Sequence, residues 1–157
     1  MMIQGLLVVI PCGVGKIWDK IPDYGVCQAR DAYTGSPFRV NQEYAETFAE
    51  KWIILSAKYG YIEPEFVIPR NYNVTFKDPK TNPVTVATLI QQIQEKSLKR
   101  FPQIIGLGGI EYRERIHQSF EAFNIPVQFP FADRGLRIGE IMSLIKRSVA
   151  QKTLFPK

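Results

Sequence analysis

The chain has 157 residues, 45% of them apolar, so it can bury one sizeable core, and we expect a single domain over residues 1–157. Twenty lysines and arginines against 15 aspartates and glutamates give a formal net charge of +5. This excess favours an anionic partner, although it also fits a protein that is basic for other reasons.

The ends and the cysteines exclude several classes of protein. The apolar start at residues 5–10 has no positively charged region before it and is too short to cross a bilayer. We therefore expect no signal peptide and no membrane contact, and a cytoplasmic location. Two cysteines and one histidine cannot supply the four ligands of a structural zinc site, and no carboxylate cluster replaces them, so we expect no metal and no cofactor.

Alternating strand and helix patterns follow along the chain. Four apolar runs rich in β-branched residues predict strands at residues 3–10, 52–56, 103–107 and 126–131. Helical spacing predicts helices at residues 41–51, 82–100, 110–123 and 138–149, the second with Asn82 as N-cap and Pro83 as first residue. This alternation predicts a three-layer α/β sandwich with right-handed crossovers between strands. The stretch from residue 60 to 80 has no clean period, which is typical of a functional loop.

Ligands of open α/β sheets bind beyond the carboxyl ends of the strands, so the loops there are the places to search. The first strand leads into LLVVIPCGVGK, which resembles a phosphate-binding loop but has Ile10 and Ile17 where that motif needs Gly and Ser or Thr. In the same loop, Asp31 could stabilise a developing cation or activate water, or it could be a turn carboxylate paired with Arg30. Cys12 is either a nucleophile or an inert buried thiol.

The second loop begins with SAKYG directly after a predicted strand. Lys58 there could hold a phosphate or attack a carbonyl-like carbon, with a solvated surface lysine as the alternative. The aromatic residues that follow could stack on a base or pin the long loop as a hydrophobic cluster.

Two further loops combine glycines with arginines. In GLGGIEYRER, Gly108 and Gly109 allow close backbone approach at a helix start suited to an anion, and Arg113 could bind phosphate or lie on a solvated face. In ADRGLRIG, Arg134 and Arg137 flank a glycine-rich turn suited to a nucleic-acid backbone contact or a wedge into a duplex.

Five motifs in order, PCGVGKIW, ARDAYTGSPF, WIILSAKYG, NYNVTF and GLRIG, resemble a family of small bacterial and phage proteins labelled as a domain of unknown function. That family is similar in fold to the uracil-DNA glycosylase superfamily, which includes the catalytic domain of archaeosine synthase. The resemblance implies a central parallel sheet of four strands in the order 2-1-3-4. It also implies similarity to a phage-defence DNA glycosylase that excises glucosylated hydroxymethylcytosine. Asn73 stands where the family pattern has aspartate, and Arg137 where it has a small residue.

The resulting hypothesis is a DNA glycosylase that flips a modified base of double-stranded phage DNA into a pocket and leaves an abasic site. We expect a monomer in which water, rather than a lysine, attacks the sugar, because both candidate lysines are expected to stay charged. The alternatives are an enzyme that modifies a base in transfer RNA and a non-catalytic nucleic-acid-binding module. Expected catalytic residues are Asp31, Lys58 and Lys16; expected substrate-binding residues are Cys12, Gly13, Tyr33, Ser56, Tyr59, Tyr72, Asn73, Gly108 and Gly109; expected nucleic-acid-binding residues are Arg113, Arg134 and Arg137.

Overall fold

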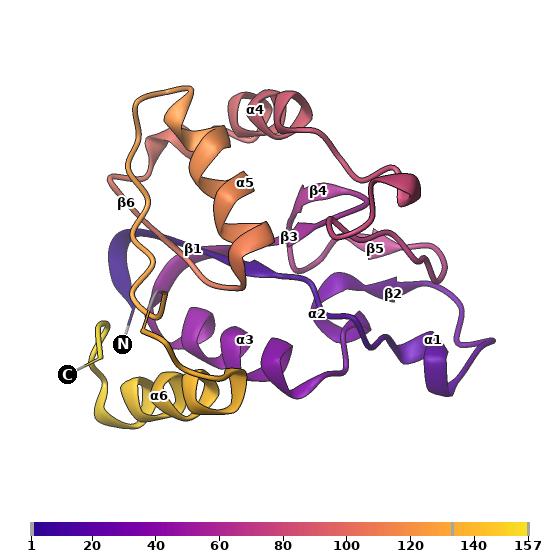
Figure 1. The fold of residues 1–157 in the computed structure, drawn as a ribbon, viewed down its shortest axis with the longest axis horizontal. Coiled ribbons are helices and arrows are strands. Elements are labelled where there is room, and N and C mark those ends of the chain that lie inside the picture. Colours follow the sequence, from indigo (N-terminus) through magenta and orange to yellow (C-terminus); the bar gives the residue numbers. More distant parts are fainter. Residues whose placement is uncertain (1, 133, 157) are drawn as a thin grey trace.

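A computed structural model describes residues 2–132 and 134–156. A four-stranded sheet in the order β4-β3-β1-β6 forms its centre (Figure 1). Strand β1 (Ile3–Pro11) pairs in parallel with β3 (Ala49–Ser56) on one side and with β6 (Gln103–Gly106) on the other. Strand β4 (Gly60–Ile62) turns back and pairs antiparallel with β3, so the sheet is mixed.

The expected parallel sheet in the order 2-1-3-4 is therefore wrong in its fourth strand. Segment 126–131 forms only one parallel bridge, between Gln128 and Ile105. Pro126 and Pro130 have no N–H group to donate to a ladder, and residues 126–130 are exposed or only partly buried. The fourth strand is instead β4, which follows β3 after a short turn and starts at Gly60 with a φ of +77°.

Helices cover both faces of the sheet, which confirms the predicted three-layer α/β arrangement. Helices α3 (Ser36–Phe48) and α6 (Ile138–Gln151) lie on one face, and α4 (Val86–Glu95) and α5 (Ile110–Glu121) on the other (Figure 1). Alternate residues of β1 enter the two resulting cores. Leu6, Val8 and Ile10 belong to one core and Leu7 and Val9 to the other. Burial on both faces explains why this strand reads as a continuous apolar run.

The predicted starts of two helices are wrong: α3 begins at Ser36 rather than Asn41, and α4 begins after residue 82. Asn82 has a left-handed φ of 58° and ends the short 3₁₀ helix η1 (Pro79–Thr81) instead of capping α4. The N-cap of α4 is Thr85, whose side chain accepts a hydrogen bond from the Thr88 N–H. The predicted helix also ends early, because Ser97 takes a left-handed φ of 56° before a second 3₁₀ helix, η2 (Leu98–Arg100).

The stretch expected to be an irregular loop contains regular structure. Besides β4, it includes β5 (Val67–Ile68), which pairs antiparallel with β2 (Cys27–Gln28) in a second small sheet. This sheet and the short helices α1 (Ile17–Lys20) and α2 (Ala29–Ala32) join the loop after β1 to the loop after β3 (Figure 1). No described helix combines the length and apolar character needed to span a membrane.

Candidate functional site

A pocket of about 630 Å³ opens at the carboxyl ends of β1 and β6. Its described walls come from loop 11–15, the first half of α3, residues 75–77, loop 106–109 with the start of α5, and residues 129–132 and 134–136 with the first turns of α6. The site lies where an open α/β sheet places its ligands. Gly108 makes the approach of two of these loops possible, because its φ is +116° and a Cβ there would lie 2.9 Å from Cγ of Pro11.

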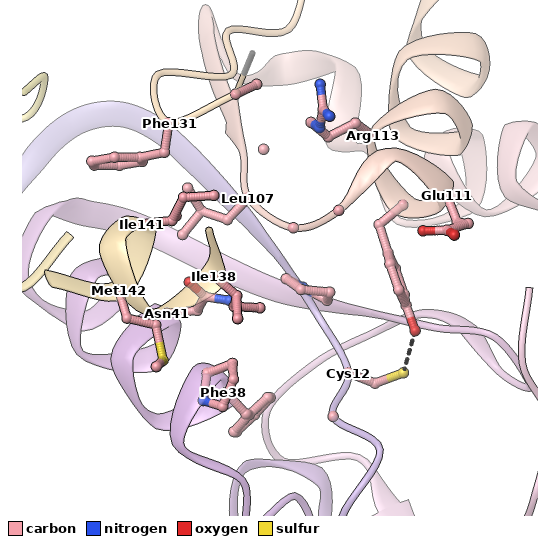
Figure 2. A pocket seen from close by; sticks show the side chains of 18 of the residues that line it. Cys12, Phe38, Asn41, Leu107, Glu111, Arg113, Phe131, Ile138, Ile141 and Met142 are labelled. Carbon is pink, nitrogen blue, oxygen red and sulfur yellow. Dashed lines mark hydrogen bonds between the residues drawn. The ribbon is translucent and has the colours of Figure 1, made fainter. Parts of the chain in front are cut away.

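The pocket lining is mostly apolar and carries a few polar side chains. A hydrogen bond of 3.3 Å joins the Cys12 thiol and the Tyr112 hydroxyl in the pocket wall. Figure 2 marks this bond by a dashed line at Cys12. Glu111, in the first turn of α5, is the one carboxylate among the described lining residues. The Asn41 side chain enters from α3 on the opposite side, among apolar neighbours (Figure 2). Such a small set of polar groups in an apolar cavity is typical of a small-molecule or base pocket.

Basic side chains also line the pocket. Lys77, Arg113 and Arg134 contribute to its walls, and the Arg134 guanidinium donates a 3.1 Å hydrogen bond from Nε to the carbonyl of Pro130. Arg137 is exposed at the N-cap of α6, beside the lining residues Leu136 and Ile138. The predicted nucleic-acid-binding arginines are thus brought to one region of the surface, at or next to the pocket.

A buried polar cluster lies on the other side of loop 11–15; it consists of Lys16, Tyr33, Ser56 and Tyr72. The Tyr33 and Tyr72 hydroxyl groups are 2.5 Å apart, and the Tyr72 hydroxyl lies 3.1 Å from Oγ of Ser56. The Lys16 ammonium donates to the Val14 carbonyl at 3.2 Å and sits 4.5 Å from the centre of the Tyr72 ring. These contacts order the loop that forms one pocket wall.

Burial dominates the electrostatics of the cluster. It lowers the pKa of Lys16, an effect that the nearby Cys12 and Asp19 partly oppose. Burial also raises the pKa values of Tyr33, Tyr72 and Tyr112, and the neighbouring Cys12 raises them further. Lys16 was expected to lie in a polar setting that keeps it charged. It is instead buried, and this burial makes its charged form less favourable than that of an exposed lysine. Its charge state in the folded protein stays a prediction.

The structure brings most of the predicted substrate-binding residues together. Those at the pocket are Cys12, Gly13, Gly108 and Gly109, and those in the buried polar cluster are Tyr33, Ser56 and Tyr72. Tyr59 packs edge-on against Tyr72 with ring centres 5.5 Å apart. The exposed Lys58 lies next to the same ring, its Nζ 5.6 Å from the ring centre.

Two predicted residues are placed elsewhere. Asp31 is exposed on α2 and does not line the pocket. Burial raises the pKa of the Cys27 thiol, and the Asp31 charge raises it further. Asn73 is exposed and belongs neither to the pocket lining nor to the buried polar cluster. Their positions give no support to a role in chemistry at the pocket.

Four pocket residues that the site argument uses were not selected from the sequence: Asn41, Lys77, Glu111 and Tyr112. Glu111 and Tyr112 lie in the quoted motif GLGGIEYRER, at the start of the predicted helix 110–123, and were given no role. Asn41 was taken as the first residue of a helix, although the helix begins five residues earlier at Ser36. The available signal was its spacing of three from Phe38, which puts a polar amide on an apolar stripe.

Comparison with known proteins relates this geometry to a family. A family described as "Family of unknown function (DUF6884)" matches residues 9–147, which extend from β1 into α6 and include the main pocket walls. The chain belongs to this family. The predicted membership in a domain-of-unknown-function family is thus confirmed.

A relative of this DUF6884 protein is the "Uncharacterized protein YfjM" of Bacillus subtilis (strain 168). The two are 34% identical over 147 residues, which cover 93% of this chain and 96% of the relative. No solved structure matches the chain. The family match and the Bacillus relative give no evidence of a relationship to DNA glycosylases, so that relationship stays a hypothesis.

Proposed function

We propose that the protein is a DNA glycosylase that excises a modified base, with glucosylated hydroxymethylcytosine as the expected target, in defence against phages. The observation that carries this proposal is the pocket of about 630 Å³ at the strand ends. It has the volume range of small-molecule sites and room for a base larger than uracil. Its basic lining favours a polyanion, and a fold like that of uracil-DNA glycosylases fits the three-layer arrangement.

A flipped nucleotide explains the combination of apolar walls and basic side chains. Enzymes that act on a base in a duplex extrude it into a pocket and pay the cost of unstacking. In this proposal the base enters the apolar interior, and Lys77, Arg134 and Arg137 contact phosphates at the entrance. The formal net charge of +5 supports association with DNA.

The chemistry would depend on Glu111. Breaking the bond between the sugar C1′ and the base nitrogen leaves positive charge on the sugar, which a carboxylate stabilises. Water then adds its oxygen to C1′, one of its protons is released, and the departing base is protonated. Glu111 takes the role predicted for Asp31, because Glu111 lines the pocket and Asp31 does not.

One observation favours a second candidate, an enzyme that modifies a base in RNA through a covalent intermediate. The Cys12 thiol lies in the pocket wall, 3.3 Å from the Tyr112 hydroxyl, and interacts electrostatically with Lys16. Cysteine attacks carbon centres through its sulfur. In this alternative, the Cys12 sulfur would add to one carbon of a ring double bond of the base while the neighbouring carbon takes a proton, and later loss of that proton and of the sulfur would restore the double bond and release Cys12, with the N-glycosidic bond retained.

The test is to incubate the protein with DNA containing glucosylated hydroxymethylcytosine, with unmodified DNA and with transfer RNA. Strand cleavage by alkali only in the modified DNA is the expected result, since alkali cuts at abasic sites. Altered nucleosides in the RNA, found by mass spectrometry, would support the second candidate. If the protein bound nucleic acid but formed neither product, the result would contradict the enzyme proposal and support a non-catalytic nucleic-acid-binding module.

A further inference from the structure

Asn41 is a largely buried residue whose amide has no protein partner. The residue is only 6% exposed, and no hydrogen bond joins its amide to another described side chain or backbone group. The amide is not one of the fully enclosed side-chain atoms that lack a partner, so the open space that it meets is the pocket. A polar group that has no protein partner and faces a cavity is suited to bind a ligand there. Gln42, the neighbouring buried amide, has a partner, because it accepts a hydrogen bond of 3.3 Å from Arg39.

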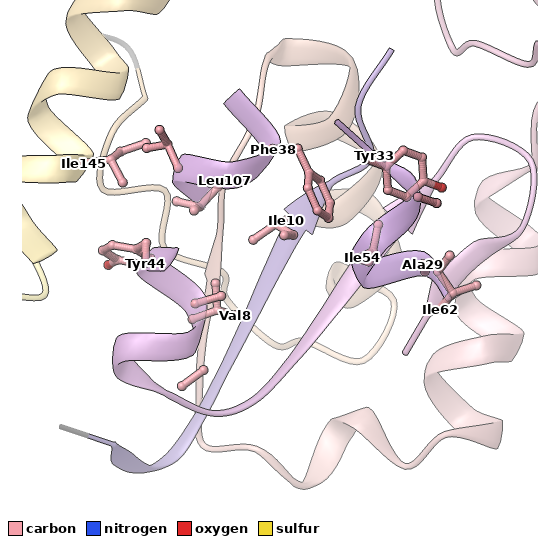
Figure 3. Packing of buried hydrophobic residues seen from close by; sticks show 14 of the residues in the cluster. Val8, Ile10, Ala29, Tyr33, Phe38, Tyr44, Ile54, Ile62, Leu107 and Ile145 are labelled. Atoms are coloured by element: carbon pink, nitrogen blue, oxygen red, sulfur yellow. The ribbon is translucent and has the colours of Figure 1, made fainter. Parts of the chain in front are cut away.

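The position of Asn41 gives no reason for a polar residue in the folded core. Helix α3 packs against the sheet and α6 through large apolar side chains such as Phe38 and Tyr44, as Figure 3 shows. Asn41 is three residues after Phe38 and four before Ala45, on the same buried stripe. A leucine would satisfy the packing there without the cost of desolvating an amide.

The amide points into the pocket. It extends from α3 toward the space bounded by Phe38, Leu107 and Ile138, while Glu111 and Arg113 lie across the cavity (Figure 2). The pocket is therefore divided into an apolar part with one neutral amide and a charged part with a carboxylate and a guanidinium. A ligand that fills both parts has an uncharged planar group at one end and a polar or charged group at the other.

We infer that Asn41 selects the ligand by binding the hydrogen-bonding edge of a nucleobase. An asparagine amide offers one acceptor and an NH₂ donor side by side, which pair with an adjacent donor and acceptor on a base. The apolar neighbours enclose the base faces, and the sugar lies toward Glu111 and Arg113. This inference rests on the proposed function and specifies which residue recognises the base.

Binding of free nucleosides tests this role without any catalytic step. Affinities are measured for deoxycytidine, 5-hydroxymethyldeoxycytidine and deoxyadenosine, and for analogues that lack the exocyclic amine: the 2-pyrimidinone nucleoside for the two cytidines and the purine nucleoside for deoxyadenosine. At least one natural or modified nucleoside should bind at least about 10-fold more tightly than its analogue. In Asn41→Leu this preference should fall to less than about twofold, because the amide that reads the edge is gone.

Two controls separate recognition from folding. Asn41→Leu should unfold at the same or a higher temperature than the natural chain, since it removes an unpartnered buried amide. Gln42→Leu, on the same helix and equally buried, should keep the nucleoside preference. A preference that survives in Asn41→Leu, or the failure of every nucleoside to bind, would overturn the inference. Preference without base release from DNA would overturn the glycosylase proposal and leave the role of Asn41 standing.

Discussion

At the scale of single residues, the proposed chemistry depends on which carboxylate faces the pocket. Glu111→Gln keeps the shape of the side chain but removes its charge, and we predict a loss of base release of at least about 100-fold. Asp31→Asn is the matched control, because Asp31 is exposed and outside the pocket, and it should keep the parental rate. Single-turnover release from modified DNA measures both. If Asp31→Asn released the base slowly while Glu111→Gln released it at the parental rate, Asp31 and not Glu111 would be the carboxylate that stabilises the sugar cation.

Lys16 allows a prediction about stability and pH. Burial lowers the pKa of its amine from the ordinary value of 10.5, so between the two values the unfolded chain binds more protons than the folded chain. The penalty for burying the charge is fully present below the lowered pKa, and stability rises with pH until about 10.5. Lys16→Met removes the charge and should therefore raise the free energy of unfolding. The difference in unfolding free energy between this variant and the natural chain should be largest near neutral pH and shrink toward high pH.

Urea unfolding of the natural chain and of Lys16→Met at about pH 7 and about pH 9.5 measures this difference. The tyrosines that are buried in the folded state ionise in the unfolded chains of both proteins, so their contribution largely cancels in the comparison. A difference that stays constant or grows with pH would show that the amine is not destabilised by its burial.

The sequence predicted the loops of the site better than the roles within them. Cys12, Gly13, Gly108 and Gly109 follow predicted strands, and parallel strands bring their carboxyl ends to one edge, so these residues meet at the pocket. The direction of Asp31 depends on α2, a helix of four residues that has no periodicity to show which side is buried. The burial of Lys16 arises from contacts with Tyr33 and Tyr72, which are distant along the chain.

At the scale of secondary structure, a buried hydrogen bond joins β4 to α5. The Tyr61 hydroxyl lies 2.7 Å from Oγ of Ser119, and Ser119 also donates to the Ile116 carbonyl. Ser119→Ala leaves the buried tyrosine hydroxyl without its partner and should cost about 1–3 kcal/mol of unfolding free energy. Tyr61→Phe leaves Ser119 its carbonyl partner and should cost less, about 0.5–1.5 kcal/mol. Denaturant unfolding of both variants measures the difference, and the reverse order would contradict this account of the contact.

The start of α4 gives a second test at this scale. The Thr85 hydroxyl accepts a 3.1 Å hydrogen bond from the Thr88 N–H, one of the donors that a helix leaves unpaired at its start. Thr85→Ala should lower the unfolding free energy by about 1 kcal/mol, whereas Thr85→Ser keeps the hydroxyl and should change it by less than half of that. Equal losses in the two variants would show that the hydroxyl is not the stabilising group.

The secondary structure itself was predicted where burial gives a long, regular signal. Strand β1 and helices α5 and α6 appear close to their expected bounds. Strand β4 was missed because it has three residues, too few to show alternation. Strand β4 and the turn before it are also held by a side chain of α4. The Gln92 side chain accepts a 2.8 Å hydrogen bond from the Tyr61 N–H and donates a 2.9 Å hydrogen bond to the Tyr59 carbonyl. Sequence patterns do not reveal a contact of this kind.

At the scale of the whole molecule, the pocket exists only because several separate parts of the chain meet. Its described walls come from loop 11–15, helix α3, residues 75–77, loop 106–109 with the start of α5, and residues 129–132 and 134–136 with the start of α6. The ends of β1 and β6 were expected there, but the contribution of α3 was not, since the helix was predicted to start at its pocket-facing residue. Apolar and charged halves of the cavity thus come from different layers, and this division gives the flipped nucleotide its proposed orientation.

The most direct test of the proposed function is to look for the free base itself. The natural chain is incubated with DNA that contains glucosylated hydroxymethylcytosine, and the low-molecular-weight fraction is analysed by mass spectrometry, with unmodified DNA as control. The account predicts free glucosylated hydroxymethylcytosine in an amount equal to the abasic sites formed, and no base from the control DNA. Modified DNA that is bound by the protein but recovered with every glycosidic bond intact would contradict it.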